Sequence, residues 1–143
     1  MTHAPLVARL ITDHGATPVD ADTLADFTER AGDRVLFFCG DPVQFPEGLD
    51  VAVVLPELQA AHPGRFAVGV VARDCEEVLA RRYGSQRWPS LVFLRDGAYV
   101  TTVPGMHDWA DYVARVGQAL AMPPSRAPTI GIPVVGAGAA TCR

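Results

Sequence analysis

Three cysteines are the residues of this chain best suited to redox or nucleophilic chemistry. Cys39, Cys75 and Cys142 lie far apart, and no two of them form the C-x-x-C spacing of a dithiol pair or a metal site. Dithiol–disulfide exchange needs one thiolate that attacks and a second thiol that resolves the intermediate, so this spacing does not favour it. Cys39 ends an apolar run and is expected to be buried. A monothiol reductase or peroxidase that uses Cys39 or Cys75 is the enzymatic alternative.

No other pattern of side chains predicts a catalytic, metal or cofactor site. The four histidines share no metal-ligand spacing, and Ser90 has no evident histidine and acid partners. All twelve cations are arginine, which excludes a Schiff-base lysine and a P-loop lysine. The glycine-rich stretch 131–138 follows no predicted strand and opens no helix, so it is not a phosphate loop. We therefore expect no catalytic residue, no bound metal and no cofactor.

The composition is typical of a single globular domain. The chain has 143 residues, of which 49% are hydrophobic and 20% charged, and its formal net charge is −4. Because there is no basic stripe, binding to nucleic acid is not expected. No apolar run approaches the roughly 20 residues that span a bilayer, and the first residues do not resemble a secretory signal. We expect a cytoplasmic protein without stable membrane insertion.

Apolar periodicity and turn residues predict the order α-α-β-α-β-α-β-β-α. The run 34–39 is continuously apolar between turn residues, which is typical of a strand buried on both faces. Strands joined through a helix run parallel, whereas Asp96-Gly97 between two β-rich runs predicts an antiparallel hairpin. The expected fold class is α/β, with a mixed four-stranded sheet and helices on both faces. The predicted elements are helices over 5–14, 22–31, 75–83 and after Asp108, a helix that begins within 51–57 and ends at 61, and strands over 34–39, 66–72, 90–94 and 98–103.

One domain and a tail are predicted. Residues 17–122 form the domain, and residues 1–16 add an N-terminal helix to it. Residues 123–143 contain four prolines and three glycines and show no periodicity. Their apolar side chains are too few to offset the entropy of ordering, so a flexible tail is predicted. A short partner-binding segment over 130–135 is the alternative for part of this tail.

Several motifs of the domain occur in the order and spacing of a known fold family. Tyr83-Gly84 precedes Pro89 and a predicted strand, as a tyrosine-glycine pair precedes the cis-proline and its strand in thioredoxins. Asp96-Gly97 and Gly105 fall where thioredoxins carry a hairpin turn and a glycine after the last strand. The resemblance covers about residues 17–121 and implies a thioredoxin-like fold with a cis peptide bond before Pro89.

The resemblance fails at the redox site. Val43-Gln44-Phe45-Pro46 stands where thioredoxins have their C-x-x-C, and Phe37 occupies the position of their buried aspartate. Alignment with thioredoxin therefore implies that redox activity has been lost, in agreement with the cysteine spacing.

Three stretches resemble a smaller group that shares this loss. Residues 40–58, 87–97 and 108–110 are similar to the HyaE/HupG/HoxO family of hydrogenase expression proteins. That resemblance implies a non-enzymatic chaperone in the maturation of nickel–iron hydrogenases. Its implied partner is the iron–sulfur small-subunit precursor, or the twin-arginine signal peptide of that precursor, before export; other hydrogenase maturation proteins are further implied partners. The alternative is a redox-inactive thioredoxin-like interaction domain that serves another complex.

A thioredoxin-like fold also implies where a client would bind. It brings the loop after the first core strand, the cis-proline loop and the turn before the last helix to one end of the sheet. An extended client segment would pair there, with Phe45 and Trp88 as apolar anchors and acidic residues facing a cationic peptide. The structural alternatives are that Phe45 folds inward, that Trp88 shields a sheet edge and that the carboxylates are only solvated. The partner-binding residues implied by the resemblance are Asp41, Pro42, Val43, Phe45, Pro46, Glu47, Trp88, Pro89 and Met106.

Overall fold

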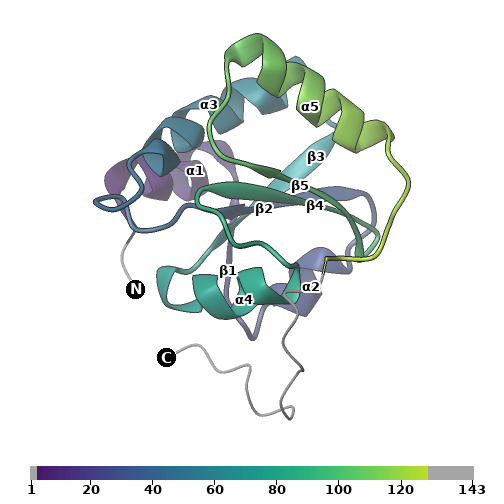
Figure 1. The fold of residues 1–143 in the computed structure, drawn as a ribbon, viewed down its shortest axis with the longest axis horizontal. Helices are drawn as coiled ribbons and strands as arrows, with labels where there is room; N and C mark the ends of the chain where they lie inside the picture. Colours follow the sequence, from purple (N-terminus) through teal and green to yellow (C-terminus); the bar gives the residue numbers. More distant parts are fainter. Residues whose placement is uncertain (1–2, 129–143) are drawn as a thin grey trace.

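A computed structural model describes residues 3–128, and within this range five strands form one mixed sheet (Figure 1). β3 runs parallel to β1 and β2, whereas β4 is antiparallel to both β2 and β5. Because β2 is central, the loop that follows it leaves from the middle of the sheet. The strands are β1 (Thr17–Val19), β2 (Asp33–Phe38), β3 (Phe66–Val71), β4 (Ser90–Arg95) and β5 (Ala98–Pro104), in the spatial order β1-β3-β2-β4-β5.

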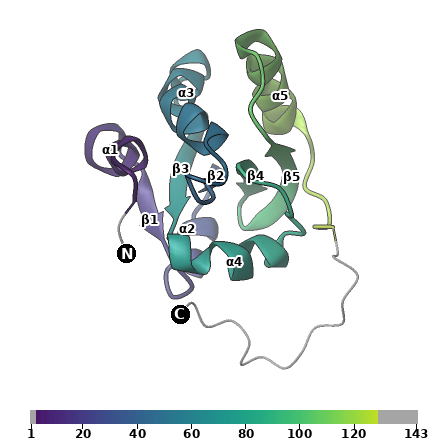
Figure 2. The ribbon, with the colours of Figure 1, turned by 60° about the vertical axis from the view of Figure 1, so that its left-hand side comes forward.

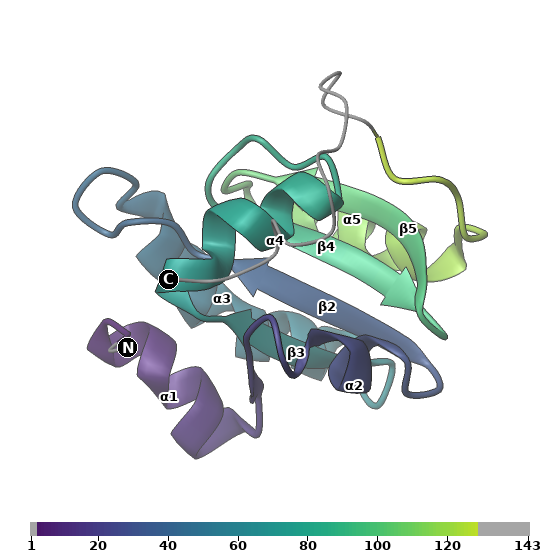
Figure 3. The same ribbon diagram turned by 90° about the horizontal axis from the view of Figure 1, so that it is seen from below.

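Helices cover both faces of this sheet (Figure 2). One face carries α1 (Pro5–His14), α3 (Glu47–Ala61) and α5 (Trp109–Ala121). The other face carries α2 (Leu24–Thr28) and α4 (Glu76–Arg82), and a short 3-10 turn, η1 (Arg73–Cys75), leads into α4. Figure 3 shows α2 and α4 in front of the strands in a view from below. The predicted α/β class with helices on both faces is confirmed.

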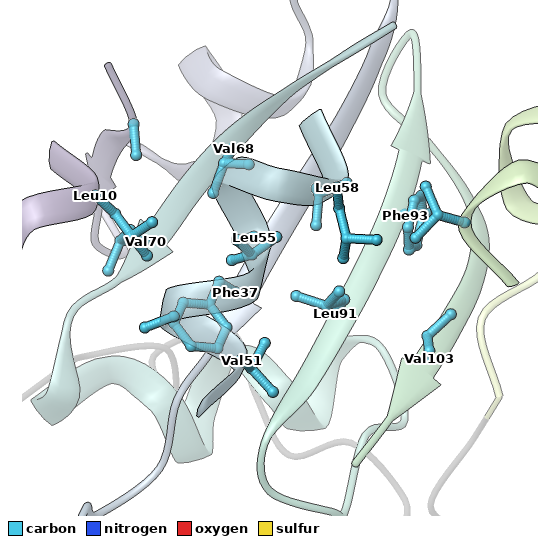
Figure 4. Packing of buried hydrophobic residues seen from close by; sticks show 14 of the residues in the cluster. Leu10, Phe37, Val51, Leu55, Leu58, Val68, Val70, Leu91, Phe93 and Val103 are labelled. Carbon is cyan, nitrogen blue, oxygen red and sulfur yellow. The ribbon is translucent and has the colours of Figure 1, made fainter. Parts of the chain in front are cut away.

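The central strand supplies side chains to two separate core layers. Val35 and Phe37 pack with residues of α1, α3 and α5, whereas Leu36 and Phe38 pack with residues of α2 and α4. Figure 4 shows Phe37 within the first layer. All four side chains are fully buried, and each such burial stabilises the fold by about 1.5–3 kcal/mol. The prediction of a strand buried on both faces is confirmed.

Two turns also follow the sequence closely. α1 ends at Gly15, whose φ of 74° lies in the left-handed region that terminates helices. Asp96 and Gly97 connect β4 and β5 with φ angles of 52° and 87°, as a two-residue hairpin turn with both φ positive requires. The predicted first helix and the predicted hairpin are therefore confirmed.

The predicted number of strands was too low by one. β1 has three residues and pairs with β3 in parallel register, with Thr17 opposite Gly69. Its central residue is Pro18, which cannot donate a ladder hydrogen bond and is tolerated because β1 lies at the edge of the sheet. A strand this short, with proline at its centre, has no alternating pattern to detect.

Three helix boundaries also differ from the prediction. α3 begins at Glu47, not within 51–57, and α2 covers only Leu24–Thr28 of the predicted 22–31. The predicted helix over 75–83 corresponds to α4, which is one residue shorter at each end, with Cys75 closing the preceding η1. Val51, in the strand-like run within α3, is buried in the core, so tertiary contacts override the weak helix propensity of valine.

The end of α5 is attached to the sheet by Arg95. Its Nε lies 2.6 Å from Oδ1 of Asp33, and its Nη1 donates to the Met122 carbonyl oxygen at 2.6 Å. Its Nη2 donates to the Leu120 carbonyl oxygen at 3.0 Å. One guanidinium therefore satisfies helix-end carbonyls and links β4 to both β2 and α5.

The chain continues along the outer strand after α5. The backbone N–H of Ser125 donates to the Tyr99 carbonyl oxygen at 2.7 Å, and the Ser125 hydroxyl donates to the Val100 carbonyl oxygen at 2.9 Å. The first part of the predicted tail thus contacts β5. The predicted flexibility of the remainder, and the alternative segment over 130–135, concern residues outside the described range.

Candidate partner-binding site

The loop after β2 and the turn before β4 meet at one end of the sheet. The ring centroids of Phe45 and Trp88 are 6.5 Å apart, and the Trp88 ring is 6.1 Å from the ring of Phe38. Gly40 permits this approach, because a Cβ built on it would lie 2.9 Å from Trp88 Cβ and its φ is +80°. The peptide bond between Trp88 and Pro89 is cis, as the resemblance implied.

The turn after β5 joins this end of the sheet through Gly105. The Gly105 N–H donates to the Pro89 carbonyl oxygen at 2.8 Å, and the buried Tyr112 hydroxyl donates to the Gly105 carbonyl oxygen at 2.8 Å. Met106 follows and packs against the core layer of α3 and α5. The three segments expected to meet are therefore together, whereas their binding to a partner stays a prediction.

The nine predicted binding residues differ in exposure. Val43, at the tip of the loop, is 89% exposed, whereas Pro89 is buried. Phe45 and Trp88 are partly buried, and the Trp88 ring packs near the rings of Phe45 and Phe38. The binding role of Phe45 and Trp88 and their structural alternatives therefore both stay predictions. Of the other members, Pro46 and Glu47 are exposed, and Asp41, Pro42 and Met106 are half-buried.

Negative charge gathers beside the loop. Glu47 and Asp50 are exposed in the first turn of α3, where carboxylates interact favourably with the helix dipole. Asp41 lies 3.9 Å from Arg73 Nη1, so a cation partly offsets its charge.

A buried carboxylate that the sequence did not indicate lies beneath the loop. Glu76 Oε2 accepts the Gly40 backbone N–H at 3.0 Å, and Glu76 Oε1 lies 3.1 Å from Arg73 Nε. Burial raises the pKa of Glu76, although the Gly40 hydrogen bond and the Arg73 charge act in the opposite direction. In the sequence, Glu76 stands where a polar residue in the first turn of a helix is expected, so its burial gave no local signal.

Cys39 is not suited to nucleophilic chemistry. The side chain is 4% exposed, and burial, with a smaller contribution from the Glu76 charge, raises the pKa of its thiol to about 12. Almost none of it is thiolate near neutral pH. Cys75 is also buried, at the end of η1. The environment of Cys39 therefore disfavours a monothiol enzyme that uses this residue.

A shallow hollow lies on the α4 side of Trp88. Its volume is about 190 Å³, and it is open to solvent. Trp88 therefore takes part in two neighbouring features, its contact with Phe45 and this hollow. The lining residues are Glu77, Ala80, Arg81, Ser85, Gln86 and Trp88.

The described residues carry neither a metal-binding cluster nor a membrane-spanning helix. In residues 3–128, no three histidine, cysteine, aspartate or glutamate side chains are grouped to hold a metal ion. In the same range, no helix combines the length and the apolar character needed to cross a bilayer.

Comparisons with known proteins agree with one another. Residues 6–112 match the family model "Hydrogenase-1 expression protein HyaE". The chain is 56% identical over 137 residues to the hydrogenase expression/formation protein HoxO of Cupriavidus necator, a match covering 94% of this chain and 85% of that protein. It is 37% identical over 129 residues to HupG of Bradyrhizobium diazoefficiens, a match covering 87% of each chain.

A solved structure extends the similarity to three dimensions. The crystal structure of hydrogenase expression/formation protein HupG from Rhodopseudomonas palustris CGA009 matches with a TM-score of 0.53 at 42% sequence identity. The match covers 73% of this chain and 95% of that one. The family model and the relatives together show that this chain belongs to the HyaE/HupG/HoxO family of hydrogenase expression proteins.

Proposed function

We propose that this protein is a non-catalytic chaperone that binds the iron–sulfur small-subunit precursor of a nickel–iron hydrogenase before export. The recognised segment is the twin-arginine signal peptide, and binding takes place in the cytoplasm. Membership of the family gives the chain a role in hydrogenase maturation, which is the broader statement that this proposal refines.

The observation that carries the proposal is the partly buried aromatic pair at the end of the sheet. The rings of Phe45 and Trp88 are 6.5 Å apart, both residues are only partly buried, and the neighbouring Val43 is exposed. Half-buried aromatic side chains next to an exposed apolar residue are typical anchors for an extended peptide. No cysteine lies in the Val43–Pro46 loop, so a client would be held there by non-covalent contacts alone.

Charge supports the choice of client. The formal net charge is −4, and Glu47 and Asp50 are exposed beside the loop. Complementary charge speeds encounter and selects partners more than it adds affinity. A signal peptide with paired arginines provides the matching positive charge.

The most direct test changes one exposed residue in the proposed site. Val43→Arg leaves the core intact and should weaken binding of purified small-subunit precursor by about tenfold or more, because it replaces an apolar contact with a charge of the same sign as that of the client. Val53→Arg is the matched control: Val53 is 54% exposed but lies on α3, outside the predicted set, and should bind normally.

Two further comparisons separate the possible results. Precursor without its signal peptide should lose binding, and raising the salt concentration should slow association. If Val43→Arg and a Phe45→Ala/Trp88→Ala double variant both bind like the parent, the predicted binding residues are wrong. If the parent binds no precursor, the protein instead serves another complex as an interaction domain.

A further inference from the structure

The chain beyond α5 leads directly toward Trp88. Two hydrogen bonds of Ser125 attach this segment to β5, and the segment then reaches the turn after α4. The carbonyl group of Pro128 lies against Gly84, so closely that a Cβ built on Gly84 would overlap the carbonyl oxygen. The described chain therefore ends beside the residue that precedes Ser85, where the hollow next to Trp88 begins.

The hollow offers both kinds of contact that an extended segment needs. The Trp88 ring provides apolar surface, and Gln86 and Arg81 provide polar groups that can pair with a peptide backbone. The volume is about 190 Å³, and the opening to solvent allows a chain to pass across it.

The residues that follow Pro128 have a suitable composition. Residues 129–143 carry no charged side chain before the final Arg143, and residues 130–135 include four branched aliphatic side chains. An extended chain spans at most about 3.3–3.6 Å per residue, so six residues reach roughly 20 Å from Pro128, enough to cross the hollow. Contiguous apolar side chains of this kind usually find a surface to cover.

We propose that residues 130–135 dock in the hollow beside Trp88 and act as a built-in competitor of the client. The docking follows from the path of the chain, whereas the competition depends on the proposed function. Because only Thr129 separates the segment from Pro128, its effective concentration at the hollow is high, on the order of millimolar, and weak contacts suffice to occupy it. A client that uses Trp88 must displace the segment.

Tryptophan fluorescence of the full chain tests docking without any client. The sequence has two tryptophans, so Trp109→Phe leaves Trp88 as the single reporter. In that background, Ile132→Asp with Val134→Asp should make Trp88 at least about twofold more accessible to quenching by acrylamide, because a charged segment leaves the hollow. The matched control, Ala137→Asp with Ala139→Asp, adds the same charge outside the apolar segment and should leave quenching unchanged.

Three results would overturn the docking proposal. Equal quenching in the parent and the Ile132→Asp/Val134→Asp variant would show that the segment does not shield Trp88. An equal rise in the control would show an effect of charge alone. Shielding that depends on protein concentration would show docking onto a second copy of the chain.

Binding of the small-subunit precursor then tests the competition. If the segment shields Trp88 in most molecules, the Ile132→Asp/Val134→Asp variant should bind precursor at least about threefold more tightly than the parent. Unchanged affinity together with increased quenching would support docking and refute competition. Failure of the parent to bind precursor would refute the proposed function but leave the quenching result intact.

Discussion

The carboxylate of Glu76 accepts the backbone N–H of Gly40 at 3.0 Å, which ties the first turn of α4 to the start of the loop that carries Val43 and Phe45. Glu76 is 4% exposed, and its second oxygen pairs with Arg73, which itself lies 3.9 Å from Asp41. The start of this loop is therefore held by a buried carboxylate of α4, the helix on the sheet face opposite to α3.

Two replacements of Glu76 should distinguish the contribution of its hydrogen bond to stability from the contribution of its charge. Glu76→Ala leaves the Gly40 N–H without its acceptor, and we expect the free energy of unfolding to fall by about 1–3 kcal/mol. Glu76→Gln keeps an acceptor oxygen and should lose less. Urea unfolding measures both variants, and the exposed neighbour Glu77→Ala is the control, with a change within about 0.5 kcal/mol. Equal losses of unfolding free energy in Glu76→Ala and Glu76→Gln would show that the charge of Glu76, and not its acceptor oxygen, stabilises the fold.

The raised pKa of Glu76 gives a pH dependence with a definite sign. The folded protein holds the proton above the ordinary value of 4.5, so in this window the folded state binds more protons than the unfolded state. The stabilising contribution is complete below pH 4.5 and is lost as pH rises through the folded-state pKa. The stability of the parent minus that of Glu76→Gln should therefore decrease from pH 4 to pH 8. A difference that grows with pH would contradict this assignment.

Two helical glycines should respond to alanine in opposite directions. A Cβ on Gly48 would overlap the Cys39 carbonyl oxygen and lie 2.7 Å from Cys39 Sγ. Gly48→Ala should therefore destabilise the protein by about 1–3 kcal/mol, despite the higher helix propensity of alanine. On α5, a Cβ on Gly117 would meet only His62 Cε1, at 3.6 Å, and Gly117→Ala should stabilise by roughly 0.5–1 kcal/mol. Thermal unfolding of both variants decides the matter, and a stabilised Gly48→Ala would refute the close contact.

The parts of the fold that the sequence predicted are those whose signal is local. β2 is a continuous apolar run between turn residues, and the pair Asp96-Gly97 is typical of a two-residue hairpin turn with both φ angles positive. The meeting of Phe45 with Trp88 followed from the resemblance to thioredoxin, because only a known topology places residues 43 apart in the sequence side by side.

The parts that were missed depend on distant contacts. β1 is recognisable only through its pairing with β3, since Pro18 suppresses any strand pattern. The start of α3 at Glu47 depends on Gly48, which lets the helix approach Cys39. The buried carboxylate of Glu76 depends on its hydrogen bond with the backbone N–H of Gly40, which lies 36 residues earlier in the sequence. A single sequence contains no sign of that pairing.

Arg95 should be hard to replace even by lysine. Its guanidinium contacts Asp33 through Nε and the end of α5 through Nη1 and Nη2, an arrangement that a single ammonium group cannot reproduce. Arg95→Lys should lower the free energy of unfolding by about 1–3 kcal/mol and speed hydrogen exchange in the last turn of α5. Arg115→Lys is the control, because its pair with Asp111 is exposed and worth at most about 1 kcal/mol. Similar losses for the two variants would show that the Arg95 contacts add little.

Cys39 should resist alkylation in the folded protein. With a pKa of about 12, only about one thiol in ten thousand is ionised at pH 8, and the side chain is buried beneath Gly48. After treatment with iodoacetamide at pH 8, mass spectrometry of the peptide that contains Cys39 should show almost no modification, whereas the same treatment in urea should modify it fully. Rapid modification without urea would mean that the thiol is accessible and ionised, and would reopen the monothiol enzyme as an alternative to a protein that acts by binding.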